Sequence, residues 1–173
     1  TVYLENSNYY VEDIRKSIVD KYGFDKVYKQ GFTINTPLNL YLQNVATSSL
    51  RRGLIAFDKK KGWRGPLINT KFDSNWKKNI QDYKLEQSIG WKLSIIKKIN
   101  RFNVEIETED SINGVIEISS IDWTKKNFDD LFKIGDIVYV EHIKDNKFNL
   151  RQLPKVNGAI VVMDPFTGRV LAL

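Results

Sequence analysis

Five β-rich segments follow one another closely in the second half of the chain, and they constrain its fold more than any other feature. β-Branched and aromatic residues, which favour strands, are frequent in each of them. Turn signals such as Asn113–Gly114 and Asp145–Asn146 separate them. The segments are GWKLSIIKKIN (90–100), RFNVEIETED (101–110), GVIEISSIDW (114–123), GDIVYVEHI (135–143) and KFNLRQLP (147–154).

Residues 122–133, DWTKKNFDDLFK, lie between the third and fourth of these segments and can form a helical turn. The order is then three strands, a short helix and two strands. This order is typical of a small five-stranded barrel of the oligonucleotide/oligosaccharide-binding (OB) type, whose closure leaves few strand edges unpaired. We therefore predict an OB-like barrel over residues 89–154.

Two amphipathic helices are predicted in the first half. Residues 10–22 carry apolar side chains at helical spacing, and Gly23 can adopt the left-handed conformation that ends a helix. A second apolar stripe runs from Leu40 to about Gly53, with Asn39 as its cap. Arg51 and Arg52 are expected near the negative end of this helix.

The remaining parts of the first half are interpreted as linker. GFTINT (31–36) alternates as a short strand does. Residues 57–88 show neither a helical nor a strand period and are interpreted as connecting structure, in which 75–87 could hold a short helix. We assign residues 1–88 to a linker region of helices, one short strand and a basic connector.

Residues 158–173, GAIVVMDPFTGRVLAL, predict a hairpin whose two strands are almost continuously apolar. That pattern belongs to strands covered on both faces, whereas a solvated hairpin alternates. We expect residues 155–173 to open a larger sheet that continues after Leu173, and to pair with GFTINT or with a second molecule. The predicted fold class is α+β: a helical linker region, a small five-stranded OB-like barrel and a terminal hairpin.

Composition excludes several kinds of site. The chain has no cysteine and one histidine, His142, so disulfides, thiol nucleophiles and multi-histidine metal sites are excluded, and no cofactor is expected. No apolar run approaches the roughly 18 residues that a membrane helix needs. The formal net charge is +6, and residues 51–64, RRGLIAFDKKKGWR, supply most of it. We interpret this basic stretch as a solvated surface or an interdomain contact, in preference to a polyanion site.

Catalytic motifs are weak. Ser94–Lys97 matches S-x-x-K and Ser111–Asn113 matches S-x-N, but K-[ST]-G is absent. Ser94 lies in a strand-like segment, where positions three apart face opposite sides, so we interpret the match as coincidence. Glu105, Glu107 and Glu109 alternate along one strand face and are interpreted as solvated. His142 is assigned to the surface or to barrel packing.

A single-stranded nucleic-acid module is the alternative function. Aromatic residues of the barrel could stack on bases, and lysines could follow a phosphate backbone. Residues 91–173 have no net charge, however, whereas such a binder is usually basic on its binding domain, so we expect no nucleic-acid partner. The aromatic residues considered for stacking are Trp91, Phe102, Trp123, Tyr139 and Phe148, and the lysines are Lys92, Lys97, Lys98 and Lys147.

Two long strings resemble class A penicillin-binding proteins, particularly the 1A type of Gram-negative bacteria. GFTINTPLNLYLQNVATSSLRRGLIAFDKKKGWRGP (31–66) is similar to the family's segment between its glycosyltransferase and transpeptidase domains, which carries R-R-G-L, an aromatic residue and Asp, and then G-[WY]-R-G-P. Asn39 and Leu40 stand where the family usually has Asp and Pro. Residues 135–173 resemble the end of the inserted barrel and the first hairpin of the transpeptidase.

The resemblance implies a noncatalytic portion of a bifunctional peptidoglycan synthase, which polymerises glycan strands from lipid II and cross-links stem peptides. The parent would be anchored in the inner membrane by a helix outside these residues and act on the periplasmic side. The catalytic residues of both activities would also lie outside, so none is assigned and the segment is expected to be inactive by itself.

The resemblance also implies partners. They are the parent's own glycosyltransferase and transpeptidase domains, and an outer-membrane lipoprotein activator that the barrel of related proteins can receive. Exposed strands make a dimer feasible as well. The residues that we expect to meet a docking partner are Trp63, Arg64, Trp91 and Trp123.

Overall fold

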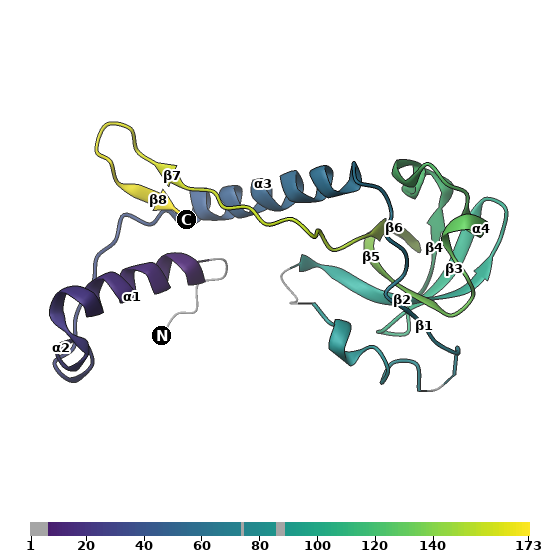
Figure 1. Ribbon diagram of the computed structural model, residues 1–173, viewed down its shortest axis with the longest axis horizontal. Coiled ribbons are helices and arrows are strands. Elements are labelled where there is room, and N and C mark those ends of the chain that lie inside the picture. The colour runs from purple at the N-terminus through teal and green to yellow at the C-terminus, as the bar shows by residue number, and fades with distance from the viewer. Residues whose placement is uncertain (1–6, 74, 86–88) are drawn as a thin grey trace. The chain divides into compact units, whose positions relative to one another are not determined.

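The computed structural model describes residues 7–73, 75–85 and 89–173, and Figure 1 labels its helices and strands. The chain divides into two compact units. One comprises residues 55–155 and is called the barrel unit below. The other comprises residues 1–54 and 156–173 and is called the helix–hairpin unit.

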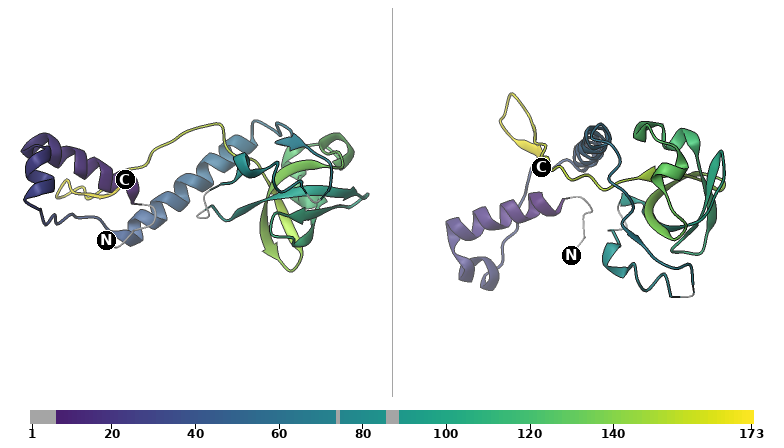
Figure 2. Two further views of the ribbon diagram at one scale, coloured as in Figure 1. Left: turned by 90° about the horizontal axis from the view of Figure 1, so that it is seen from below. Right: turned by 45° about the vertical axis from the view of Figure 1, so that its right-hand side comes forward.

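The barrel unit is a closed ring of five strands, as Figure 2 shows. Around the ring the order is β2, β3, β4, β6, β5 and again β2; β4 and β6 are parallel and the other neighbours antiparallel. The predicted α+β class with an OB-like barrel is therefore confirmed. The strands are β2 (Trp91–Ile99), β3 (Asn103–Thr108), β4 (Asn113–Glu117), β5 (Asp136–Lys144) and β6 (Lys147–Arg151).

The predicted helical turn between the third and fourth strands is α4 (Phe128–Leu131). The third predicted strand is shorter than expected, because 3-10 turns at Ile118–Ser120 and Asp122–Thr124 follow β4. Inside the ring, α4 and the inward faces of the strands form one apolar core. Its fully buried members include Ile96, Val104, Ile106, Ile116, Val140, Phe148 and Leu150.

A strap made of residues 67–73 and 75–85 covers the outer face of β2 and β5. β1 (Ile68–Asn69) pairs with β5, and Trp76 and Ile80 pack on Leu93 and Ile95 in a second apolar cluster. Both faces are thus buried in the middle of β2, Leu93–Ile96, and in the first half of β5, Asp136–Val140, where the apolar residues of these strands are concentrated. The segment interpreted as connecting structure is therefore part of the barrel unit's packing. Within 75–87, a single 3-10 turn, Gln81–Tyr83, replaces the suggested short helix; Glu86 and Gln87 lie outside the described residues.

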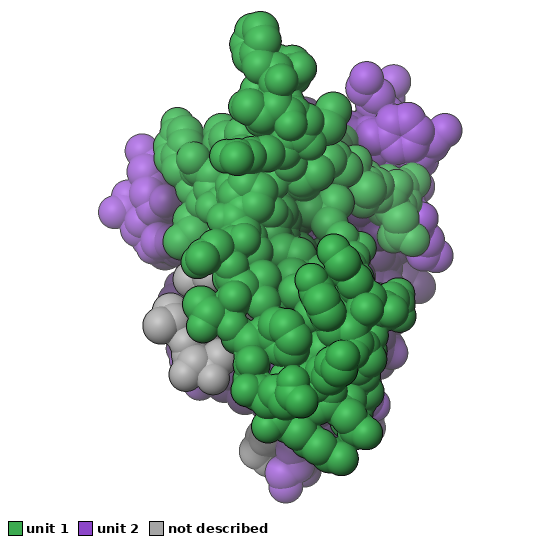
Figure 3. All heavy atoms as spheres, turned by 90° about the vertical axis from the view of Figure 1, so that its left-hand side faces the viewer, with its two compact units in different colours: residues 1–54, 156–173 green, residues 55–155 purple. Residues whose placement is uncertain are grey.

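The helix–hairpin unit, green in Figure 3, contains α1 (Asn8–Tyr22), α2 (Phe24–Lys29) and most of α3 (Leu40–Lys59). Both predicted helices are confirmed. Gly23 has φ +83°, and Asn39 caps α3 by accepting the Leu42 N–H at 3.1 Å. α3 passes Arg51 and Arg52 and ends at Lys59, so the predicted end was wrong. No proline or cap stops the helix at Gly53, and Leu54 and Ile55 continue it.

The terminal hairpin forms as predicted, with β7 (Val162–Met163) paired to β8 (Val170–Ala172). GFTINT is not a strand, and residues 31–39 carry no regular structure. The expected pairing of the hairpin with GFTINT is therefore wrong. Its physical reason is that helix groups occupy the outer edge of β8: Asn39 N–H donates to Leu171 O at 2.9 Å, and Gln43 bonds Leu173. Within the described residues, no helix combines the length and apolarity needed to cross a bilayer.

Candidate functional site at the neck of the barrel unit

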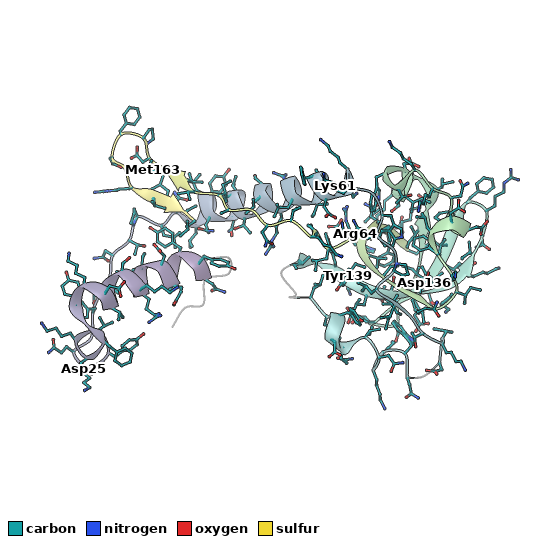
Figure 4. The ribbon with its side chains drawn as sticks, in the orientation of Figure 1. Asp25, Lys61, Arg64, Asp136, Tyr139 and Met163 are labelled. Atoms are coloured by element: carbon teal, nitrogen blue, oxygen red, sulfur yellow. The ribbon has the colours of Figure 1, made fainter. Side chains whose placement is uncertain are left out.

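The chain enters and leaves the barrel unit through two segments that lie side by side. Residues 58–64 bring it in from the end of α3, and residues 151–155 take it out after β6. We call these two segments the neck. Figure 4 shows Lys61 and Arg64 of the neck on the same side of the barrel unit as Tyr139.

The Asp58 carboxylate joins the two segments of the neck. It accepts two hydrogen bonds from Arg64 Nη1, at 2.8 and 2.9 Å, one from Gln152 Nε2 at 2.8 Å and one from the Lys155 N–H at 3.1 Å. Its side chain is only 3% exposed. Burial by itself raises the pKa of Asp58, but these hydrogen bonds and the Arg64 charge outweigh it and hold the pKa below its ordinary value.

Arg64 and Gln152 complete the connection. Arg64 Nη2 donates to Leu153 O at 2.6 Å, and the Arg64 N–H donates to Gln152 Oε1 at 2.8 Å. Gln152 Nε2 also donates to Gly62 O at 3.1 Å. The bonds of Gln152, Leu153 and Lys155 with the first neck segment join residues about ninety positions apart. The bonds between Arg64 and Asp58 close the turn that lies between these two residues. The planar guanidinium fork therefore fixes both segments of the neck at once.

A hollow of about 490 Å³ lies beside the neck. Both neck segments line it, together with part of the strap and of β5. Its walls combine aromatic rings, two prolines, four cationic side chains and one acid, Asp82. The lining includes Trp63, Arg64, Pro66, Tyr83, Lys84, Leu85, Tyr139, Arg151, Leu153, Pro154 and Lys155.

Two aromatic groups stand at the neck. Trp63 meets Trp123 and Phe132 edge-on, with ring centroids 6.0 Å apart in both pairs. The Trp63 Nε1 atom is buried and has no hydrogen-bond partner in the described part of the chain. Separately, Trp91 packs against Tyr139 at 6.4 Å, and the Arg151 guanidinium lies 5.9 Å from the Trp91 ring while it pairs with Glu141.

A match to a known protein family shows the family to which the chain belongs. Residues 63–156, more than half of it, match the family described as the penicillin-binding protein OB-like domain. The chain belongs to the penicillin-binding protein family.

Relatives of the 1A type agree with this family. The chain is 36% identical to penicillin-binding protein 1A of Rickettsia prowazekii over 96% of its own length and 22% of that protein. It is 25% identical to penicillin-binding protein 1A of Pseudomonas aeruginosa over 97% of its length and 22% of that protein. It therefore spans about a fifth of the length of these relatives.

A solved structure shares the fold. The crystal structure of penicillin-binding protein 1A from Haemophilus influenzae matches with a TM-score of 0.74 at 22% identity, over 95% of this chain and 25% of that one. At this identity the likeness concerns the fold alone.

The nucleophile motif of penicillin-binding proteins is not assembled here. Ser94 is fully buried and its hydroxyl faces Val138 O at 3.4 Å, while Lys97 binds Glu107 at 3.2 Å and Asn113 at 2.9 Å. The two side chains of the S-x-x-K match therefore do not meet, because they project from opposite faces of β2. The interpretation of the match as coincidence agrees with this geometry.

The other candidates have structural roles. Glu105, Glu107 and Glu109 form ion pairs with lysines along the outside of β3. His142 packs on Phe148 with ring centroids 5.2 Å apart. No group of three potential metal ligands occurs among the described residues.

The structure brings some of the predicted docking residues of this penicillin-binding protein chain together. Trp63 and Trp123 are in contact, and Arg64 follows Trp63 in the neck. Trp91 stands apart, against Tyr139. Sequence reasoning missed Asp58 and Gln152; the one signal for Asp58 was its place in the string that resembles the family, and nothing pointed to Gln152.

Proposed function

We propose that this chain is the noncatalytic connecting portion of a bifunctional peptidoglycan synthase. The parent polymerises glycan strands from lipid II and cross-links their stem peptides, on the periplasmic side of the inner membrane that anchors it. The portion described here holds the glycosyltransferase and transpeptidase domains in position and offers a docking surface to an activator. Family membership and the share of about a fifth of the relatives' length support this proposal.

The observation that carries the proposal is the Asp58 neck. An inserted domain needs its incoming and outgoing segments held together, or it swings freely on two linkers. One buried carboxylate bonds Arg64 from the first segment and Gln152 and Lys155 from the second. Such a connection holds the entry and the exit of the barrel unit together.

The hairpin supports the same proposal through its open edge. On β8, the Val170 carbonyl accepts from the Tyr10 hydroxyl and the Leu171 carbonyl from the Asn39 N–H, and Gln43 bonds Leu173, the residue after the strand. The other edge of the hairpin belongs to β7, which pairs with no further strand among the described residues. Met163 in β7 is 57% exposed, and Val161, just before the strand, is 56% exposed. An apolar strand with an open edge suits a larger sheet, here proposed to be that of the transpeptidase.

The nucleic-acid module is not favoured by the outer face of the barrel. β3 presents the carboxylates of Glu105 and Glu107 on that face, Glu109 directly follows the strand, and each of the three has a lysine partner. Phosphates following this strand would meet three carboxylates and would compete for lysines that are already paired.

Two measurements test the proposal. A fluorescent β-lactam added to the 173-residue chain should leave no covalent label; a label that disappears in Ser94→Ala would make the chain itself a serine acyl enzyme. In the parent enzyme, Asp58→Ala should preserve glycan polymerisation and β-lactam acylation, but lower the cross-linking of newly made glycan. Asp130→Ala, which makes the same substitution at an exposed carboxylate of α4 outside the neck and the hollow, is the matched control. Unchanged cross-linking in Asp58→Ala would contradict a positioning role.

A further inference from the structure

The fold gathers the basic side chains of the neck, which are far apart in sequence, around one buried acid. Gln152 and Lys155 bond Asp58, so residues 151–155 lie against the turn that follows α3. Asp58 is the single acid within the two neck segments. The six cationic residues of the neck are Lys59, Lys60, Lys61, Arg64, Arg151 and Lys155.

Two groups neutralise only part of this charge. Asp58 forms an ion pair with Arg64, and Glu141 forms one with Arg151. Lys60, Lys61 and Lys155 are exposed and form no ion pair with any residue that the structure describes. The neck therefore keeps a local positive excess, although the barrel half of the sequence is neutral.

The positive charge of Arg151 acts on Lys59, a further cationic residue of the neck. Its ammonium lies 5.2 Å from the centroid of the Trp123 ring. Burial and the neighbouring Arg151 charge lower the pKa of Lys59, and Glu141 only partly offsets them. An anion placed here would relieve the repulsion between Lys59 and Arg151.

The hollow beside these cations adds an apolar element. Tyr83, Leu85 and Tyr139 line it, together with Pro154 of the neck and Pro66, two residues after the first neck segment. A flat lipid surface would leave such a concavity unused, whereas one apolar side chain of an extended peptide can enter it. Charge and shape together favour a peptide over a membrane.

We propose that the neck binds an extended acidic segment of a partner protein, whose carboxylates meet Lys60, Lys61 and Lys155 while an apolar side chain enters the hollow. This inference rests on the proposed docking function and names the chemistry of its partner. Opposite charge would mainly raise the rate of encounter, and the hollow would supply orientation.

The test uses fluorescence anisotropy with the dye-labelled peptide Asp-Glu-Asp-Phe-Asp-Glu-Asp and the 173-residue chain. We expect saturable binding that weakens about tenfold when the salt concentration rises from about 50 to about 300 mM, because screening shortens the reach of exposed charges. The analogue with Ala in place of Phe should bind more weakly, and the analogue with Lys in place of every acid should not bind.

Two charge-reversed variants locate the site. Lys60→Glu/Lys61→Glu should weaken binding about tenfold, whereas Lys71→Glu/Lys78→Glu, which changes two exposed lysines of the strap by the same charge, should stay within about twofold. Circular dichroism confirms that both variants fold.

Three results would overturn the inference: no binding of the acidic peptide at about 1 mM, equal loss in both variants, or equal binding of an oligothymidylate or of phosphatidylglycerol vesicles. A failure here concerns only the partner's chemistry, since the positioning role is tested separately by Asp58→Ala in the parent enzyme.

Discussion

The side-chain amide of Gln43 pairs with the backbone of Leu173 in both directions. Gln43 Nε2 donates to Leu173 O at 2.9 Å, and the Leu173 N–H donates to Gln43 Oε1 at 3.0 Å. A carboxamide carries the same donor and acceptor as a peptide group, so Gln43 replaces a neighbouring strand at this point of β8. Gln43 is 2% exposed, which places this pair out of competition with water.

Gln43→Ala should therefore lower the stability of the helix–hairpin unit. It leaves the N–H and C=O of Leu173 without their partner, at a cost of about 1–3 kcal/mol. Hydrogen exchange of the Leu173 amide should accelerate, and the unit should unfold at lower urea concentration. Gln30→Ala removes an exposed amide and is the control. Unchanged exchange at Leu173 would show that the pair is dispensable.

Breaking the neck should destabilise the barrel unit. Asp58→Ala leaves the Arg64 guanidinium, the Gln152 amide and the Lys155 N–H without their common acceptor, and we expect a loss of about 2–3 kcal/mol. Asp58→Asn keeps one acceptor oxygen and should lose less. Urea unfolding followed by tryptophan fluorescence measures both variants. The prediction fails if Asp82→Asn, at an exposed position, has the same effect as Asp58→Ala.

The same carboxylate should make stability depend on pH. The folded-state pKa of Asp58 lies below its ordinary value, so in the relevant range the unfolded chain binds more protons than the folded one. Its contribution is complete above the ordinary pKa of an aspartate and is lost as the pH falls through the lowered one. Unfolding free energies measured from pH 7 down to about pH 3 should fall more steeply for the wild-type chain than for Asp58→Asn. Parallel curves would contradict this assignment.

The barrel was predictable because its signals are local. Alternation in NVEIET fixes the inward and outward faces of β3, and Asp145–Asn146 marks the turn between β5 and β6. The turn predicted at Asn113–Gly114 was wrong, because these are the first two residues of β4 and the chain turns earlier, at Glu109–Asp110. The strap was not predictable, because Trp76 and Ile80 occur without any period and are buried by long-range contact with β2 and β5. GFTINT alternates like a strand but does not pair with β8, because Asn39 and Gln43, at the start of α3, bond the backbone of Leu171 and Leu173.

The site was less accessible to sequence reasoning than the fold. Trp63 and Arg64 were selected because of their residue types, but the acid that holds Arg64 lies six residues earlier and its other donors lie 94 and 97 residues later. No local pattern reports such a long-range hydrogen bond. The basic stretch was interpreted as surface or contact, and the structure divides it: Arg64 is structural, whereas Lys60 and Lys61 remain exposed.

Gly114 should be essential for closing the barrel. A Cβ at this position would lie 2.3 Å from Phe148 Cε2 and 2.7 Å from Asn146 O, at the place where β4 and β6 run parallel. Its φ is not positive, so the cause is a clash and not backbone strain. Gly114→Ala must displace the Phe148 ring or separate the two strands, and we expect a loss of about 2–3 kcal/mol in urea unfolding.

The control for this prediction is Gly62→Ala. Gly62 has φ +85° and no atom near its absent Cβ, so its substitution should cost only the backbone strain, about 1 kcal/mol. Adding Phe148→Leu to Gly114→Ala should recover part of the stability, because the smaller side chain makes room for the new methyl group, and the coupling in this double-mutant cycle measures the contact. If the two changes simply add, the glycine is not required by Phe148, and closure of β4 on β6 has another cause.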